Sequence, residues 1–106
     1  MKFENANVLI TGGASGIGKI MGRMALERGA RRFIIWDINL AGIEKTRKEL
    51  SSYGKVKGYV VNVADNDVVT AAYRKTVEDC GPIDILINCA GIVTSNKTFD
   101  QQTTEE

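Results

Sequence analysis

The sequence predicts an α/β fold in which helices cover both faces of a parallel sheet. Short apolar runs alternate with amphipathic stretches, and no repeat or low-complexity tract interrupts the alternation. A glycine-rich loop joins the first run to the first amphipathic stretch, as expected of a strand that turns sharply into a helix. With right-handed crossovers, the expected strand order is 3-2-1-4. The length of 106 residues allows one domain at most.

The glycine-rich loop predicts an anion site. Val8 to Thr11 suit a strand buried on both faces. The helix that follows the loop has its apolar residues at helical spacing, at Ile17, Ile20, Met21, Met24 and Ala25. Gly12 would permit the sharp turn, and Gly16 would let the backbone approach a ligand. Gly18 and Gly22 would let the helix lie close to the sheet. Unpaired N–H groups and the positive end of the helix dipole would then face a pyrophosphate.

An acidic residue at the end of the second strand completes a dinucleotide site. The apolar run Phe33 to Trp36 is followed by Asp37, nineteen residues after Gly18. At this position a carboxylate would accept hydrogen bonds from the adenosine ribose. It would also repel the 2′-phosphate of NADP, and Arg31 and Arg32 lie at the far end of the strand. The predicted cofactor is therefore NAD.

The remaining chain repeats the pattern of strand and helix. The expected elements are a first helix ended by Gly29, a second capped by Asn39 and ended by Tyr53 and Gly54, a third strand from Lys57 to Val63, a third helix capped by Asp65 or Asn66 and stopped by Gly81 and Pro82, and a fourth strand from Ile83 to Asn88. The inward positions would be Leu40, Ile43 and Leu50 in the second helix and Val68, Val69, Ala72 and Val77 in the third. Residues 92–106 are predicted to be a polar tail that leads into a helix start at Thr103 or Thr104.

Four stretches converge on one edge of such a sheet. Ligands bind open α/β sheets at the carboxyl ends of the strands, where the strand order reverses. Those ends carry residues 11–18, Asp37, Asn62 with Val63, and residues 88–91. We therefore expect the dinucleotide to lie across this edge.

Composition argues against several other classes of function. The chain is 43% hydrophobic and has a net charge of +1, so its charge implies neither nucleic-acid binding nor attraction to a membrane surface. It contains no apolar run of membrane-spanning length, and its start, MKFENAN, does not resemble a signal peptide, so a cytoplasmic location is expected. There is no histidine, and Cys80 and Cys89 lie at opposite ends of a predicted strand, so we expect neither a metal cluster nor a disulfide.

Four motifs follow one another at the carboxyl edge. They are TGGASGIG after the first strand, WDIN at the second, NVAD after the third and NCAG after the fourth. Together they resemble the amino-terminal, cofactor-binding half of the short-chain dehydrogenase/reductase family. This resemblance covers essentially the whole chain and implies a partial Rossmann-type three-layer domain over residues 1–106, truncated before its fifth strand. Asn62 stands where the family usually has aspartate, and Cys89 where it has asparagine.

The resemblance implies a role for each residue of the edge. Those that would hold the pyrophosphate are Gly12, Ser15, Gly16, Ile17 and Gly18, and Asp37 would hold the ribose. The adenine would be bordered by Asn62 and Val63, and the cofactor would be lined by Asn88, Ala90 and Gly91. In the complete enzyme the partner would be a small alcohol or carbonyl substrate that exchanges hydride with NAD.

The resemblance also implies that the catalytic residues are missing. The family's catalytic serine, its Tyr-x-x-x-Lys pair and an asparagine of its fourth helix would all lie beyond residue 106, so this chain is expected to be inactive alone. Tyr53 and Lys57 have the spacing of the pair. They enter the third strand at the edge opposite the cofactor, however, and cannot reach a nicotinamide.

Three functional interpretations follow. The first is the cofactor-binding half of an NAD-dependent oxidoreductase. The second is a non-catalytic dinucleotide-binding module or an excised folding unit, which would show no hydride transfer. The third is a structural α/β domain, which would need neither the acidic residue nor motifs aligned on one edge.

The fourth strand would form an open edge of the sheet. Its sequence, IDILIN from Ile83 to Asn88, has one charge, Asp84, and would leave N–H and C=O groups unpaired on one side. We expect self-association through this edge. We also expect a contiguous apolar patch near Leu86 and Ile87, because no further helices cover the strand.

Overall fold

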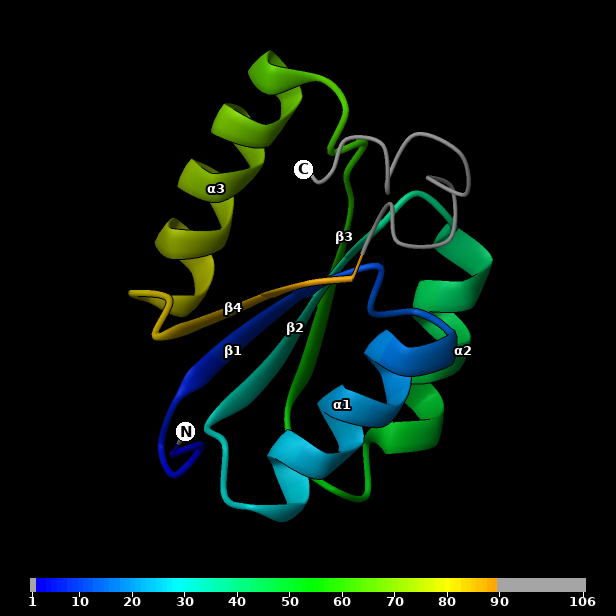
Figure 1. Cartoon of the computed structure of the whole chain (residues 1–106), viewed down its shortest axis with the longest axis vertical. Helices are drawn as coiled ribbons and strands as arrows, with labels where there is room; N and C mark the ends of the chain where they lie inside the picture. The colour runs from blue at the N-terminus through cyan, green and yellow to red at the C-terminus, as the bar shows by residue number, and fades with distance from the viewer. Residues whose placement is uncertain (1, 90–106) are drawn as a thin grey trace, which may run out of the picture.

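The computed structural model describes residues 2–89, along which strands and helices alternate (Figure 1). The strands are β1 (Asn7–Thr11), β2 (Arg32–Asp37), β3 (Val56–Val60) and β4 (Ile85–Asn88). The helices are α1 (Gly16–Glu27), α2 (Leu40–Leu50) and α3 (Asn66–Cys80). The predicted tail over residues 92–106, with its helix start at Thr103 or Thr104, lies outside the described residues.

The four strands form one parallel sheet in the order β3-β2-β1-β4, which confirms the predicted order. β1 is central, and its Leu9 pairs with Ile34 of β2 and with Leu86 of β4. Figure 1 shows α1 and α2 on one face of the sheet and α3 on the other, so the three-layer arrangement is also confirmed. The carboxyl ends of all four strands therefore meet at one edge.

The sheet separates two hydrophobic clusters, because successive residues of a strand face opposite sides. In β1, Val8 and Ile10 join the larger cluster with α1 and α2, and Leu9 joins the smaller one. The smaller cluster also contains Ile34, Trp36 and Val61, and α3 contributes only partly buried residues to it. The face under α3 is consequently the less well covered.

α1 contacts the sheet through small residues, so the predicted apolar stripe of this helix is partly wrong. Its buried residues are Gly18, Gly22, Ala25 and Leu26. Ile17 and Ile20 are 62% and 60% exposed. The reason is close approach, since a Cβ built on Gly22 would lie 2.2 Å from the ring of Phe33 in β2. Ile17 and Ile20 therefore point away from the sheet, whereas Leu26 and Met21 pack against the core.

The predicted end of α1 and the predicted start of α2 agree with the structure, whereas α2 ends at Leu50, before the predicted Tyr53 and Gly54. After α1, Gly29 has φ 90°, and the N–H groups of Gly29 and Ala30 donate to the carbonyls of Leu26 and Ala25, as in a Schellman motif. Asn39 caps α2 by accepting a hydrogen bond from the Gly42 N–H. These two helix boundaries are therefore set by local signals that the sequence contains.

For α3, Asp65 rather than Asn66 is the N-cap, and its carboxylate accepts from the N–H groups of Asp67 and Val68. At the other end, Gly81 has φ 88° and donates its N–H to the Val77 carbonyl. Gly81 therefore ends the helix, as predicted.

Two strands are shorter than predicted. β3 ends at Val60, which pairs with Asp37, the last residue of β2, so the chain beyond has no strand to pair with. Asn62 instead forms a turn, in which its side chain accepts from the Ala64 N–H. β4 begins at Ile85 rather than Ile83. The reason is that the Asn7 N–H donates to the Asp84 carboxylate and not to a backbone carbonyl of the fourth strand.

The inward faces of α2 and α3 also differ from the prediction. Leu40 and Val68, at the helix starts, are 59% and 38% exposed. Two threonines are fully buried instead, Thr46 in α2 and Thr76 in α3. Each hydroxyl is hydrogen-bonded, as a buried polar group must be to avoid a large cost.

We expect Gly22→Ala to destabilise the fold by about 1–3 kcal/mol, because the new methyl group would overlap the buried Phe33 ring. The measurement is the free energy of unfolding in urea. Met24→Ala, at a 41% exposed position of the same helix, is the control and should change stability by about 0.5 kcal/mol or less. Equal stability of the two variants would contradict the close approach of α1 to the sheet.

Candidate functional site

The predicted site residues that the structure describes lie at the carboxyl ends of the strands. Residues 12–18 follow β1, Asp37 ends β2, Asn62 and Val63 follow β3, and Asn88 ends β4. Ser15, Gly16, Ile17, Asn62, Val63 and Asn88 are exposed, and Gly12 and Asp37 are half-buried. Gly18 is buried. Ala90 and Gly91 lie outside the described residues.

The glycine loop has the backbone conformation that its glycines permit. Gly12 and Gly16 have φ of 71° and 58°. A Cβ built on Gly16 would meet no atom within 4 Å, so the loop faces open space at this point. A Cβ on Gly18 would lie 2.3 Å from the Gly12 carbonyl oxygen. Gly18 therefore allows the start of the helix to lie against the loop, whereas Gly22 allows the helix to pack closely on the sheet.

The N-terminus of α1 is left without a side-chain cap. Ser15 is the N-cap residue, but its side chain makes no capping hydrogen bond. The first turn also contains no acidic residue. The positive end of the helix dipole is therefore not balanced by the helix's own side chains, which is the property that makes a helix start attractive to an anion.

Asp37 connects the end of β2 to the glycine loop. One carboxylate oxygen accepts from the Ala14 N–H at 3.1 Å, and the other accepts from the Asn39 N–H at 3.0 Å. A carboxylate can accept about four hydrogen bonds, so acceptor capacity is left for hydroxyl groups of a ligand. The same residue can thus shape the loop and bind a sugar.

Thr11 joins β1 to β4 at the edge. Its hydroxyl donates to the Asn88 side-chain oxygen at 2.7 Å and accepts from the Cys89 N–H at 3.1 Å. Sequence reasoning assigned no role to Thr11. Its position as the last residue of the first strand suggests a role at this edge. Its partner can be identified only from the strand register, which puts Thr11 opposite Asn88.

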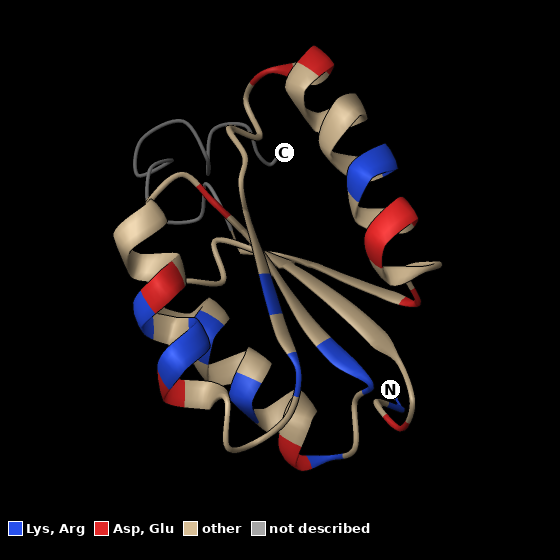
Figure 2. Ribbon diagram, turned by 180° about the vertical axis from the view of Figure 1, so that it is seen from behind, with Lys and Arg blue, Asp and Glu red and all other residues tan. Residues whose placement is uncertain are grey.

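Residues 11–18 and 37–39 at the carboxyl edge contain one acidic residue, Asp37, and no Lys or Arg. Figure 2 shows Lys and Arg on the helices and toward the amino-terminal ends of the strands. Arg32 donates to the Asn7 side-chain oxygen and to the Cys80 carbonyl, at the end of the sheet opposite Asp37. Lys19, just after the loop, pairs with Glu49 of α2, and this hydrogen bond lowers the pKa of the Glu49 carboxyl.

A tyrosine hydroxyl can act as an acid/base catalyst, but Tyr53 and Tyr59 make their contacts away from the carboxyl edge of the sheet. Tyr53 follows α2, where Arg23 lies 4.8 Å from its ring centroid. Tyr59 donates its hydroxyl to Asp79 at 2.8 Å, near the end of α3. Burial, and secondly this hydrogen bond, raise the pKa of Tyr59. Neither residue is placed for proton transfer at the carboxyl edge of the sheet.

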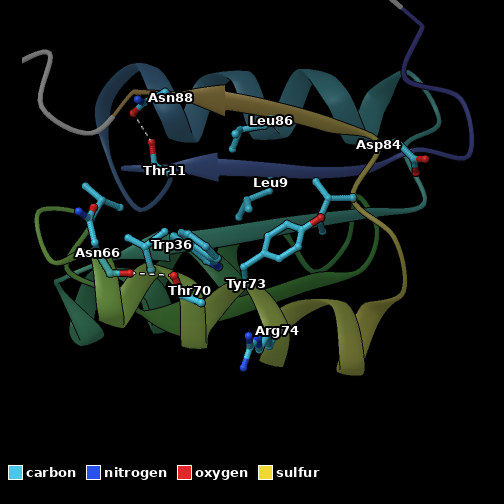
Figure 3. Close-up of a pocket in the computed structure, with 13 residues that line it drawn as sticks. Leu9, Thr11, Trp36, Asn66, Thr70, Tyr73, Arg74, Asp84, Leu86 and Asn88 are labelled. Carbon is cyan, nitrogen blue, oxygen red and sulfur yellow. Dashed lines mark hydrogen bonds between the residues drawn. The ribbon is translucent and has the colours of Figure 1, made fainter.

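A large hollow lies between α3 and the sheet, and Thr11, Val63 and Asn88 line it where it reaches the carboxyl edge (Figure 3). It has a volume of about 660 Å³ and is lined mainly by apolar groups, among them Leu9, Trp36, Tyr73 and Leu86. Leu86 is 62% exposed, whereas Ile87 packs against the cluster under α1. Apolar surface therefore remains near Leu86, as predicted, but Ile87 is not part of it, because adjacent strand residues face opposite sides of the sheet.

In the part of the chain that the structure describes, no group of three or more His, Cys, Asp or Glu could hold a metal ion. No helix in residues 2–89 is both long and apolar enough to cross a membrane. Cys80 and Cys89 are free thiols.

Comparison with known proteins identifies similar sequences and folds. A family model described as short chain dehydrogenase matches residues 6–106. The chain is 41% identical over 93 residues to 3-oxoacyl-[acyl-carrier-protein] reductase FabG of Thermotoga maritima, covering 87% of this chain and 37% of that protein. It is 34% identical over 96 residues to estradiol 17-beta-dehydrogenase 11 of Rattus norvegicus, covering 90% of this chain and 32% of that protein.

A solved structure of NAD⁺-bound xylitol dehydrogenase is also similar, with a TM-score of 0.75 and 26% identity, over 81% of this chain and 33% of that one. The chain spans about a third of the length of the curated relatives it matches.

We expect Thr11→Val to lower the free energy of unfolding by about 0.5–1.5 kcal/mol, because it removes the hydroxyl that links Asn88 and Cys89 to β1. Thr11→Ser keeps the hydroxyl and is the matched control. Urea unfolding of both variants measures the difference. A serine variant no more stable than the valine variant would contradict a structural role for the hydroxyl.

Proposed function

The chain belongs to the short-chain dehydrogenase family, and from this premise we propose that it is the cofactor-binding half of an NAD-dependent oxidoreductase. The complete enzyme would transfer hydride between nicotinamide and an alcohol or carbonyl substrate. Members of this family bind nicotinamide dinucleotides, and a similar solved structure contains NAD⁺. What this chain contributes is the binding and orientation of the cofactor.

The observation that carries the proposal is the hydrogen bond between Asp37 and the Ala14 N–H. It brings an acidic group, which suits ribose hydroxyls, against a loop that suits a pyrophosphate. The two groups come from different strands and are separated by 23 residues. A structural α/β domain has no need to bring them together, so the contact favours a nucleotide site.

The residues present fit a dinucleotide. The open space beside Gly16 leaves room for phosphate oxygens, and no side chain caps the helix start that would attract them. Asp37 retains acceptor capacity for the ribose. The residues that we assign to the cofactor are Gly12, Ser15, Gly16, Ile17 and Gly18 for the pyrophosphate, Asp37 for the ribose, Asn62 and Val63 for the adenine, and Asn88, Ala90 and Gly91 along the cofactor. When bound, NAD would supply the hydride acceptor.

We place acid/base catalysis outside these 106 residues. The sequence contains three tyrosines. Tyr53 and Tyr59 make contacts away from the carboxyl edge, and Tyr73 lines the hollow under α3. The chain alone should therefore bind the cofactor without turning it over. Hydride transfer by this chain to an alcohol or ketone would contradict this assignment.

We expect NAD to bind more tightly than NADP. The negative charge of Asp37 disfavours a 2′-phosphate, and residues 11–18 and 37–39 contain no Lys or Arg to offset it. Asp37→Asn removes the charge and keeps an oxygen that can accept the Ala14 N–H. This variant should lower the ratio of NAD affinity to NADP affinity by about tenfold, because it removes a repulsion of about 1–2 kcal/mol.

Calorimetric titration of both nucleotides measures the ratio. Asp37→Ala removes the charge together with the acceptor for the loop, so it should narrow the ratio and also weaken the binding of both nucleotides. Equal affinities of NAD and NADP for the unchanged protein would overturn the assignment of Asp37.

We also propose that this chain self-associates through the edge of the sheet formed by β4. Within the described residues, β4 pairs only with β1, so its other side offers unpaired backbone groups. The 62% exposed Leu86 adds apolar surface beside that edge.

Leu86→Lys should weaken this association by about tenfold or more, because it places a charge on apolar surface. Leu86 is a better probe than Ile85, which packs against the core. Sedimentation velocity across a range of concentrations measures the effect. Val60→Lys, at a 55% exposed position on the opposite edge strand, is the control. A monomeric unchanged protein, or equal effects of the two substitutions, would contradict the proposal.

A further inference from the structure

Thr46 is a polar residue in a position that the fold otherwise gives to apolar side chains. It lies on the inward face of α2 between Ile43 and Leu50, and it is fully buried. A hydroxyl buried without a hydrogen bond would be costly, so its partner is informative. That partner is the carbonyl oxygen of Ala14 in the glycine loop, at 2.9 Å and 32 residues away.

This hydrogen bond differs from those of other helical threonines in the chain. Thr70 and Thr76 of α3 donate to the carbonyls of Asn66 and Ala72, four residues earlier in their own helix. That is the usual bond of a threonine within a helix. Thr46 instead connects its helix to a separate loop, and Gly42, one turn earlier, faces the same loop. A Cβ built on Gly42 would lie 3.4 Å from the Ala14 Cβ.

The bond fixes the direction of the peptide group that joins Ala14 to Ser15. The described chain has no cis peptide bond, and in a trans peptide the C=O and the N–H point in opposite directions. Because Thr46 holds the Ala14 carbonyl toward the buried side, the Ser15 N–H is turned toward the opposite side. Asp37 holds the preceding N–H, that of Ala14, so the residue is fixed on both sides.

We propose that Thr46 is a positioning residue for the cofactor, a role that rests on the proposed dinucleotide site. Its hydroxyl keeps the backbone from Ala14 to Gly16 in the orientation that presents N–H groups to the phosphates. It touches no part of the ligand itself. Its contribution is preorganisation, since a loop that must rotate a peptide before binding loses affinity.

The test compares two ligands that differ only in the phosphates. Calorimetry measures the affinities of ADP and adenosine for the full chain. Thr46→Val keeps the shape of the side chain and removes the hydroxyl. We expect this variant to weaken the affinity for ADP by about tenfold and to change the affinity for adenosine by about twofold or less. In the proposed site only the phosphates contact the loop amides. Thr46→Ser keeps the hydroxyl and should restore the affinity for ADP.

Thr76→Val is the matched control. Thr76 is equally buried and hydrogen-bonded, but its partners are Trp36 and Ala72 rather than the loop. It should lower stability without changing the ratio of ADP to adenosine affinity. If Thr46→Val does not fold, the ADP affinities of Thr46→Ala and Thr46→Ser are compared instead, because these two variants differ only in the hydroxyl.

The outcomes separate this inference from the proposed function. If the unchanged protein binds neither ligand, the proposed site fails and the role of Thr46 fails with it. If the unchanged protein binds ADP but Thr46→Val binds it equally well, only the role of Thr46 is overturned. Equal weakening of ADP and adenosine would likewise overturn it, because that is the result of a general loss of stability.

Discussion

Two hydrogen bonds to Ala14 hold the glycine loop in place, and the candidate site depends on them. Asp37 accepts from its N–H at the end of β2, and Thr46 donates to its carbonyl from α2. A glycine-rich loop is otherwise the part of a chain with the most conformational freedom to lose. The parallel order β2-β1 and the packing of α2 beside α1 are therefore what convert a flexible segment into a defined anion site.

The two faces of the sheet have different consequences for function. On the face of α1 and α2, the close contact of Gly22 with Phe33 holds α1 against the sheet, and Gly18 lets the start of the helix lie against the loop after β1. On the other face, α3 leaves an apolar hollow with Leu86 exposed. The first face supports the proposed nucleotide site, whereas the second leaves apolar surface for the proposed association.

Local signals in the sequence were sufficient for much of the fold. Asn39, Gly29 and Gly81 mark helix ends through their own backbone and side-chain chemistry, and the structure confirms them. Features that depend on distant partners were missed. Ile17 points outward because Gly22 meets Phe33, and Thr46 points inward because the Ala14 carbonyl needs a donor. β3 ends early because β2 does. The assigned cofactor contacts stay predictions.

The most direct test of the account is a map of backbone amide shifts in the NMR spectrum of the full chain during titration with ADP. We expect the largest shifts in residues 12–18, with further shifts at Asp37, Asn62 and Val63. Residues at the opposite edge, such as Arg32 and Lys57, should not shift. Unchanged shifts in residues 12–18, or shifts confined to the α3 side of the hollow at Thr70, Tyr73 and Arg74, would contradict the proposed site.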